Sequence, residues 1–340
     1  MNYRRIEMKL NKTLVALTIG LLGLTSCDKT DDPLEPSGNY SPLRVDFPQG
    51  TNEWDSRIEQ IYKTYGVYLI YKDVTPEDLN RTWVSVGTGD LYYGDDLPDE
   101  EVSFYVDFFE QQIFPYFSPE VVQKAFPIKI YMLKHLRAEA QDFGGDDTGT
   151  GTGTGTGTII TEVLPSGFKA MKWDGFDYWA ISFTESEIYA SDDQSMKQKR
   201  CGIIYQIIAN MVEDGTIVEP ADLRDGVDLE TALSVQKSNQ NYRFNRGIPN
   251  SILTSFGVGT RTGAAELTGD YSGANSMIST YSGENNHEYF LNYIRNIMWF
   301  TATEFEEKYS AYPLIVEKYN LVANYMLVNC GLDLKAIAGE

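Results

Sequence analysis

Histidine is the residue this chain most conspicuously lacks. Only His135 and His287 occur among its 340 residues, and they lie on different segments. Zinc enzymes of the hydrolytic type hold their metal with two or three imidazoles, or with imidazoles and a carboxylate. The sequence also contains no G-x-S-x-G elbow, the turn that presents a serine nucleophile in many hydrolases. We therefore expect no catalytic residues, no bound metal and no cofactor, and we interpret each histidine as structural.

Cysteine is almost as scarce. The chain has three, Cys27, Cys201 and Cys330. The last two stand in apolar helical patterns, where free cysteine behaves as a small core residue. A disulfide between Cys201 and Cys330 is the alternative for an exported protein.

Positive charge is also in short supply. The 28 Lys and Arg residues face 49 Asp and Glu residues, which gives a formal net charge of −21. Phosphate recognition needs clustered Lys and Arg, so nucleic acid is excluded as a partner. Anionic membrane surfaces are disfavoured as docking sites for the same reason.

The N-terminus has the pattern of an export signal. Arg4, Arg5, Lys9 and Lys12 precede the apolar run LVALTIGLLGL, Leu14 to Leu24, which is shorter than the roughly 20 apolar residues of a membrane-spanning helix. The following LTSC resembles the lipobox of bacterial lipoproteins, in which the cysteine is acylated. We expect a signal peptide over residues 1–26, lipid on Cys27 and an outer-membrane location facing the cell exterior. A plain secretory signal with an incidental Cys27 is the alternative.

Two stretches lack the apolar pattern of a core. The acidic, Pro-containing residues 27–43 are expected to form a flexible tether. The Gly-Thr repeat within residues 144–158 is expected to form a loop, because glycine raises the entropic cost of ordering and no lysine follows at phosphate-loop spacing. The remaining chain, residues 44–340, is expected to be one domain.

The pattern of apolar residues in that domain predicts an α+β fold with a small mixed sheet and packed helices. Helices are predicted near residues 54–65, 102–117, 201–213, 287–309 and 313–330, strands near residues 67–74 and 126–136, and a hairpin turning at Asp174 and Gly175. Residues 214–286 are polar and Gly-rich with weak periodicity, so a long irregular region is expected there.

Three stretches resemble a known family. RIEQIYKTYGVYLIYKDV, FPIKIYMLKHL and AYPLIVEKYNLVANYMLVNCGLDLKAI are similar to segments of the candidate zinc-binding metallopeptidase lipoproteins of Bacteroidota. This zincin-like family is often found beside glycan-uptake systems of the SusC and SusD type. The resemblance implies a zincin-like domain over roughly residues 44–337, and partners such as SusC/SusD-type proteins or a glycan or peptide ligand.

The resemblance also shows that the central helix lacks the metal-binding residues of the family. In the family this helix carries an HExxH-type motif, with a further histidine one turn later. The stretch CGIIYQIIANMVEDG places Tyr205, Gln206, Ala209 and Val212 at those four positions. Two imidazoles at i and i+4 hold zinc and the glutamate takes a proton from the bound water, so this set supports neither task. We expect a degenerate, non-catalytic member, with a hydrolase that uses an unrecognised non-zinc site as the alternative.

Two sets of side chains are candidates for binding a ligand. Tyr205 and Gln206 could line a cleft that once held zinc, although the helix is equally explained as core, with Ile204, Ile207, Ile208, Met211 and Val212 on its apolar side. Aromatic rings at the predicted hairpin could stack on sugars; these are Trp173, Phe176, Tyr178 and Trp179, of which about half should be sheet core. The acidic stretch DLRDGVDLE, residues 222–230, lacks the spacing of a calcium loop.

Overall fold

The computed structural model describes residues 43–81, 90–139, 166–175, 177–190, 192–256, 262–266, 281 and 286–339. The chain divides into two compact units, Met1–Asp46 and Phe47–Glu340, and the elements below all belong to the second. Four sequence predictions lie outside the described residues: the signal peptide, lipid on Cys27 with its tether, the Gly-Thr loop, and Phe176. Within the described residues, no helix combines the length and apolar character needed to cross a membrane.

A five-stranded mixed sheet is built around one long strand, β3 (Lys129–Glu139). Its first half pairs in parallel with β1 (Tyr68–Ile70) on one side and β5 (Tyr178–Ile181) on the other. Its second half pairs antiparallel with β2 (Leu91–Asp96), and β4 (Met171–Lys172) pairs antiparallel with β5. The predicted small mixed sheet is confirmed, and β3 runs three residues beyond its predicted end.

The first helix of the domain begins at a capping box and ends at a glycine in the left-handed conformation. In α2 (Glu53–Tyr65), the Asp55 carboxylate accepts from the Asn52 backbone N–H at 2.8 Å, and Gly66 ends the helix with φ +76°. The same carboxylate accepts from the Tyr71 hydroxyl at 2.9 Å and so ties the helix start to the end of β1.

A second group of helical segments follows β2. It consists of α4 (Asp99–Phe108), a π-helical turn (Phe109–Ile113), a 3₁₀ turn (Phe114–Tyr116) and α5 (Pro119–Ala125). The side chains predicted to point inward, Tyr105, Phe108, Phe109 and Ile113, are all buried.

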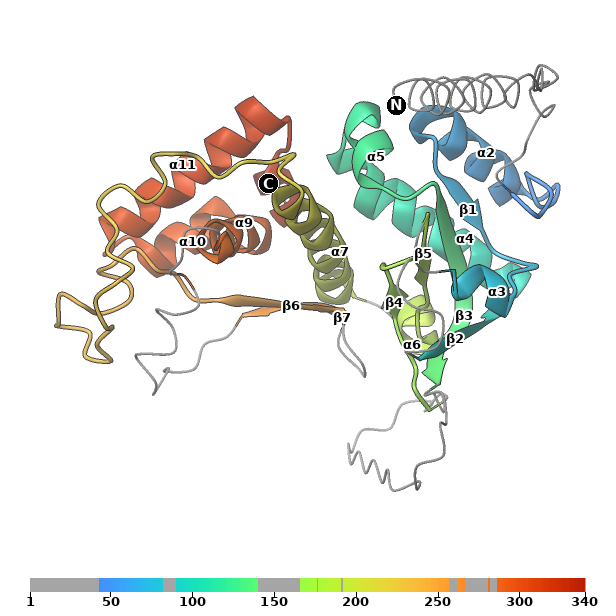
Figure 1. Cartoon of the computed structure of the whole chain (residues 1–340), viewed down its shortest axis with the longest axis horizontal. Coiled ribbons are helices and arrows are strands. Elements are labelled where there is room, and N and C mark those ends of the chain that lie inside the picture. Colours follow the sequence, from blue (N-terminus) through green and yellow to red (C-terminus); the bar gives the residue numbers. More distant parts are fainter. Residues whose placement is uncertain are drawn as a thin grey trace, which may run out of the picture. The chain divides into compact units, whose positions relative to one another are not determined.

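The helix α7 (Asp193–Glu213) lies between two groups of elements, as Figure 1 shows. It contacts α5 and the π-helical turn on one side. On the other it contacts α9 (Glu288–Trp299), α12 (Leu334–Ala338) and the hairpin of β6 (Ile252–Phe256) and β7 (Thr262–Glu266). One apolar core therefore runs through the domain, with α7 in contact with both groups.

The C-terminal helices match the prediction except at one break. The predicted helix over residues 287–309 is two helices, α9 and α10 (Ala302–Tyr309). Phe300 is extended, and Thr301 caps α10 through its hydroxyl, which accepts from the Glu304 N–H at 3.2 Å. The T-x-x-E spacing of a capping box was present in the sequence. The last long helix, α11 (Pro313–Cys330), has its predicted bounds.

Candidate functional site

The apolar side of α7 is a core surface. Its five predicted apolar residues, Ile204, Ile207, Ile208, Met211 and Val212, are all buried. Cys201 is also buried, and its thiol lies 3.2 Å from the carbonyl oxygen of Met298 on α9. Both Cys201 and Cys330 are free, so the disulfide alternative is not realised. Burial raises the pKa of the Cys201 thiol to about 11, as suits an unreactive core residue.

Tyr205 does not open into a cleft but meets a buried arginine. Its side chain is only 8 % exposed, and its hydroxyl accepts a hydrogen bond from Arg295 Nη1 at 2.6 Å. The Arg295 guanidinium carbon also lies 4.9 Å from the centre of the Tyr205 ring, within cation–π range. Burial raises the pKa of Tyr205, and Arg295 opposes that rise. The phenol is therefore neutral at physiological pH.

The other three positions of the degenerate motif offer no metal ligand set. The Gln206 amide donates to Asn210 Oδ1 at 2.7 Å along the same helix. Ala209 is half-buried against the core, and Val212 is fully part of it. The family resemblance implies zinc at these positions, and the residues present do not fit it.

No group of three or more His, Cys, Asp or Glu side chains in the described part of the chain could hold a metal ion. In the acidic stretch 222–230, Asp228 instead accepts from the backbone N–H groups of Glu230 and Thr231, each at 2.9 Å. It also pairs with Arg246 at 3.0 Å. These contacts are those of a turn-stabilising residue.

The aromatic residues of the hairpin are mostly interior. Strands β4 and β5 form the predicted antiparallel pair, with Met171 opposite Ile181. Tyr178 is completely buried and its hydroxyl donates to the Leu79 carbonyl, while Trp179 is 6 % exposed. The sequence makes Tyr178 and Trp179 candidates for stacking on a sugar and predicts about half of the hairpin rings as core; both lie in the core, because β5 is buried along its whole length and therefore on both faces. Trp173, before the strand, is half-buried against the core.

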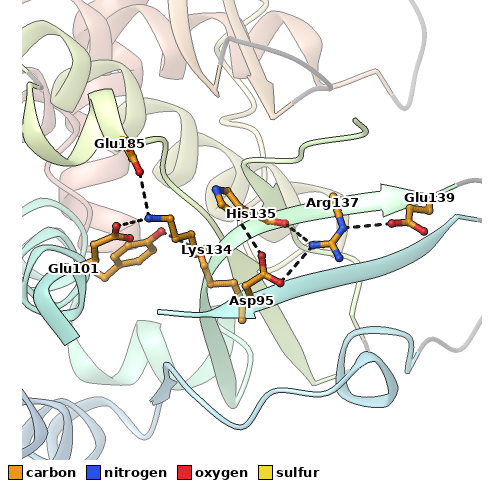
Figure 2. A network of polar contacts seen from close by, with 9 residues as sticks. Asp95, Glu101, Lys134, His135, Arg137, Glu139 and Glu185 are labelled. Carbon is orange, nitrogen blue, oxygen red and sulfur yellow. Dashed lines mark hydrogen bonds and ion pairs between the residues drawn. The ribbon is translucent and has the colours of Figure 1, made fainter. Parts of the chain in front are cut away.

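A network of polar contacts lies where β2 pairs with β3, and Figure 2 shows it. The register shifts between Tyr93 and Asp95, because β3 contains one residue more than β2 at this bulge. His135 stands at the bulge with φ +55°, and its Nδ1 lies 3.2 Å from Asp95 Oδ2. Arg137 pairs with Asp95 and with Glu139 at 3.6 and 3.3 Å.

A second part of this network surrounds Lys134. Its ammonium donates to the buried Glu101 at 2.7 Å and to Glu185 at 3.4 Å, so it joins α4 to α6 (Glu185–Tyr189), as Figure 2 shows. The sequence analysis missed both parts. Their residues come from four separate elements, β2, α4, β3 and α6. The one available signal was the alternation of His135, Arg137 and Glu139 with apolar residues along a strand.

The second histidine also meets a carboxylate. His287 stands at the start of α9, as predicted, and its Nδ1 lies 3.4 Å from Glu219 Oε2. Glu219 in turn accepts from Arg224 at 2.6 Å. Each histidine therefore has a structural partner, far from Tyr205 and from the other histidine in sequence.

Comparison with known proteins gives one distant likeness. No family model matches the chain, and no curated protein matches it. Among solved structures, it is similar to a candidate zinc-binding metallo-peptidase from Bacteroides caccae, at 10 % identity and a TM-score of 0.42. That match covers 85 % of this chain and 92 % of the other. At this identity, nothing about the other protein's activity transfers to this chain.

Proposed function

We propose that this protein is a non-catalytic surface lipoprotein with a degenerate zincin-like domain. The observation that carries the proposal is the environment of Tyr205. The position that the family resemblance assigns to the first zinc-binding histidine holds a buried phenol bonded to Arg295 at 2.6 Å. A neutral phenol held by an arginine cation is no zinc ligand, so zinc-bound water would not be activated there.

The role we propose is that of a binding or accessory component of an outer-membrane nutrient-uptake system, with a glycan as the nutrient. The lipobox-like LTSC and the acidic residues after Cys27 support a lipid anchor on the outer face. The family resemblance supplies the association with SusC/SusD-type proteins. Of the motif positions, Gln206 is the half-exposed polar one and the best placed to contact a ligand.

The first prediction tests the loss of zinc chemistry. Elemental analysis of the purified protein, prepared without chelator, should find no stoichiometric zinc, and the protein should cleave no peptide substrate. Chelator should leave its melting temperature unchanged, because no metal-binding energy contributes to folding. One tightly held zinc per chain would overturn the proposal and reopen the peptidase interpretation.

A hydrolase without zinc is the alternative function, and the His135–Asp95 pair is the observation that favours it. An imidazole oriented by a carboxylate is half of a general-base arrangement. The test compares wild type with the His135→Ala variant against ester, peptide and glycan substrates. A hydrolysis rate that falls a hundredfold or more in the variant, in line with the size of a general-base effect, would favour the alternative. We expect no turnover by either protein.

A further inference from the structure

Arg295 is a buried cation whose charge needs an explanation. Its side chain is 8 % exposed, and it lies on the face of α9 that contacts α7. Burying a charge is costly unless the charge is paired and hydrogen-bonded. Its partners are therefore the key to what it does.

Those partners join two helices. Arg295 Nη2 pairs with Glu288, two turns earlier on α9, and Nη1 donates to the Tyr205 hydroxyl on α7 at 2.6 Å. Burial alone would lower the pKa of Arg295, but Tyr205 and Glu288 more than offset this and raise it. The guanidinium is thus a permanent positive charge held between α7 and α9.

We infer that Arg295 has taken the structural place of the metal ion. It is the cation that fixes α7 against α9, and its charge excludes a divalent metal from this face of α7. The inference rests on the proposed assignment of the zinc-ligand positions to Tyr205 and Ala209. A second cation beside a buried guanidinium meets like-charge repulsion that water cannot screen.

One buried atom adds to this picture. Arg295 Nε has no hydrogen-bond partner among the described residues, although it is shielded from solvent. An unmet buried donor is unfavourable. The unmet Nε donor persists because the same guanidinium bonds to Tyr205 and Glu288. Those two contacts hold the Arg295 side chain in one conformation between α7 and α9.

The test rebuilds half of the zinc site with and without the arginine. The double variant Tyr205→His/Ala209→His places two imidazoles at i and i+4 on α7, and the triple variant adds Arg295→Met. Zinc should raise the melting temperature of the triple variant by several degrees, reversibly with chelator, and should leave the double variant unchanged. Arg243→Met added to the double variant is the matched control, because Arg243 and Arg295 are equally buried, each 7 % exposed as a whole residue, but Arg243 bonds to the Pro249 carbonyl.

A zinc-dependent shift of equal size in the double variant would overturn the inference and leave the proposed function intact. A zinc ion in the wild-type protein would instead overturn the proposed function. The two failures are therefore distinguishable.

A second measurement covers the case in which the triple variant does not fold. A double-mutant cycle of Tyr205→Phe and Arg295→Met in the wild-type background should show coupling. The combined variant should lose less stability than the sum of the two single variants, by about tenfold in the unfolding equilibrium constant, or about 1.4 kcal/mol. Purely additive losses would show that Tyr205 and Arg295 are not tied together.

Discussion

Asp228 shows how one exposed carboxylate can organise a stretch with no regular secondary structure. It accepts hydrogen bonds from two successive backbone N–H groups and pairs with the buried Arg246. The Thr231 contacts are the largest cause of its lowered pKa, followed by the Glu230 N–H, and the pKa falls to about 2. The folded state therefore favours the ionised form more strongly than the unfolded chain does.

The pH dependence of stability follows from that shift. Between the folded pKa of about 2 and the unfolded value of 3.8, the unfolded chain binds more protons, so this contribution is present above pH 3.8 and is lost as the pH falls towards 2. Asp228→Asn should destabilise the protein at neutral pH. The difference in unfolding free energy between variant and wild type should become smaller as the pH falls from 3.8 towards 2. Urea unfolding across the pH range measures it. Asp225→Asn, which removes another exposed carboxylate of the same stretch, is the control for the loss of one negative charge.

At the level of single residues, burial could be predicted and polar partners could not. The apolar face of α7 follows from helical periodicity, because residues three and four apart share a side. The partner of Tyr205 is 90 residues away in sequence, and that of His135 is 40 residues away. Periodicity carries no information about such pairs. It also could not show that Tyr178 and Trp179, on opposite faces of β5, are both covered.

The backbone irregularity of the β2–β3 pair is concentrated at one residue, His135. His135 has φ +55°, in the left-handed region that costs an L-residue about 1–2 kcal/mol. A bulge of this kind usually uses glycine at that position. The histidine is tolerated there because its ring has a partner in Asp95, as Figure 2 shows.

A matched pair of variants isolates the free-energy cost of the left-handed backbone conformation at residue 135. His135→Gly and His135→Ala both remove the imidazole and its contact with Asp95. Glycine should nevertheless give the more stable protein by about 1 kcal/mol, the reverse of its usual effect inside a strand. Chemical unfolding of the two variants measures the difference. An alanine variant as stable as the glycine variant would contradict the left-handed conformation of residue 135.

Elements with strong apolar patterns were predictable, and those held by polar pairing were not. The sequence pattern predicts α2 and α11 because each combines a long periodic run with an end signal, Gly66 or Gly331. It predicts β3 from a long apolar run alone. Strand β2 lies in a polar stretch and pairs through its backbone with β3. The β6–β7 hairpin lies in the region expected to be irregular. Strand pairing is a long-range property, so neither element had a local signal.

At the scale of the whole molecule, the negative net charge is consistent with the proposed attachment to the outer membrane through a lipid. A formal net charge of −21 repels nucleic acid and anionic membrane surfaces. A protein of this kind does not adhere to an anionic bilayer by electrostatics, so stable attachment would need a covalent anchor. Several acyl chains hold a protein stably at a membrane, whereas a single chain does so only marginally. The proposed lipid on Cys27 would supply such an anchor.

The last prediction tests that anchor. Cys27→Ala should abolish incorporation of labelled fatty acid and should shift the protein from the outer-membrane fraction to a soluble or unprocessed form. Cys330→Ala is the matched control, because Cys330 lies at the end of α11 in the folded domain and should not affect labelling. Surface protease accessibility in intact cells then separates an outward-facing protein from a periplasmic one. Unchanged acyl labelling in the Cys27→Ala variant would refute the lipoprotein prediction, because Cys27 is the single cysteine at the end of the leader.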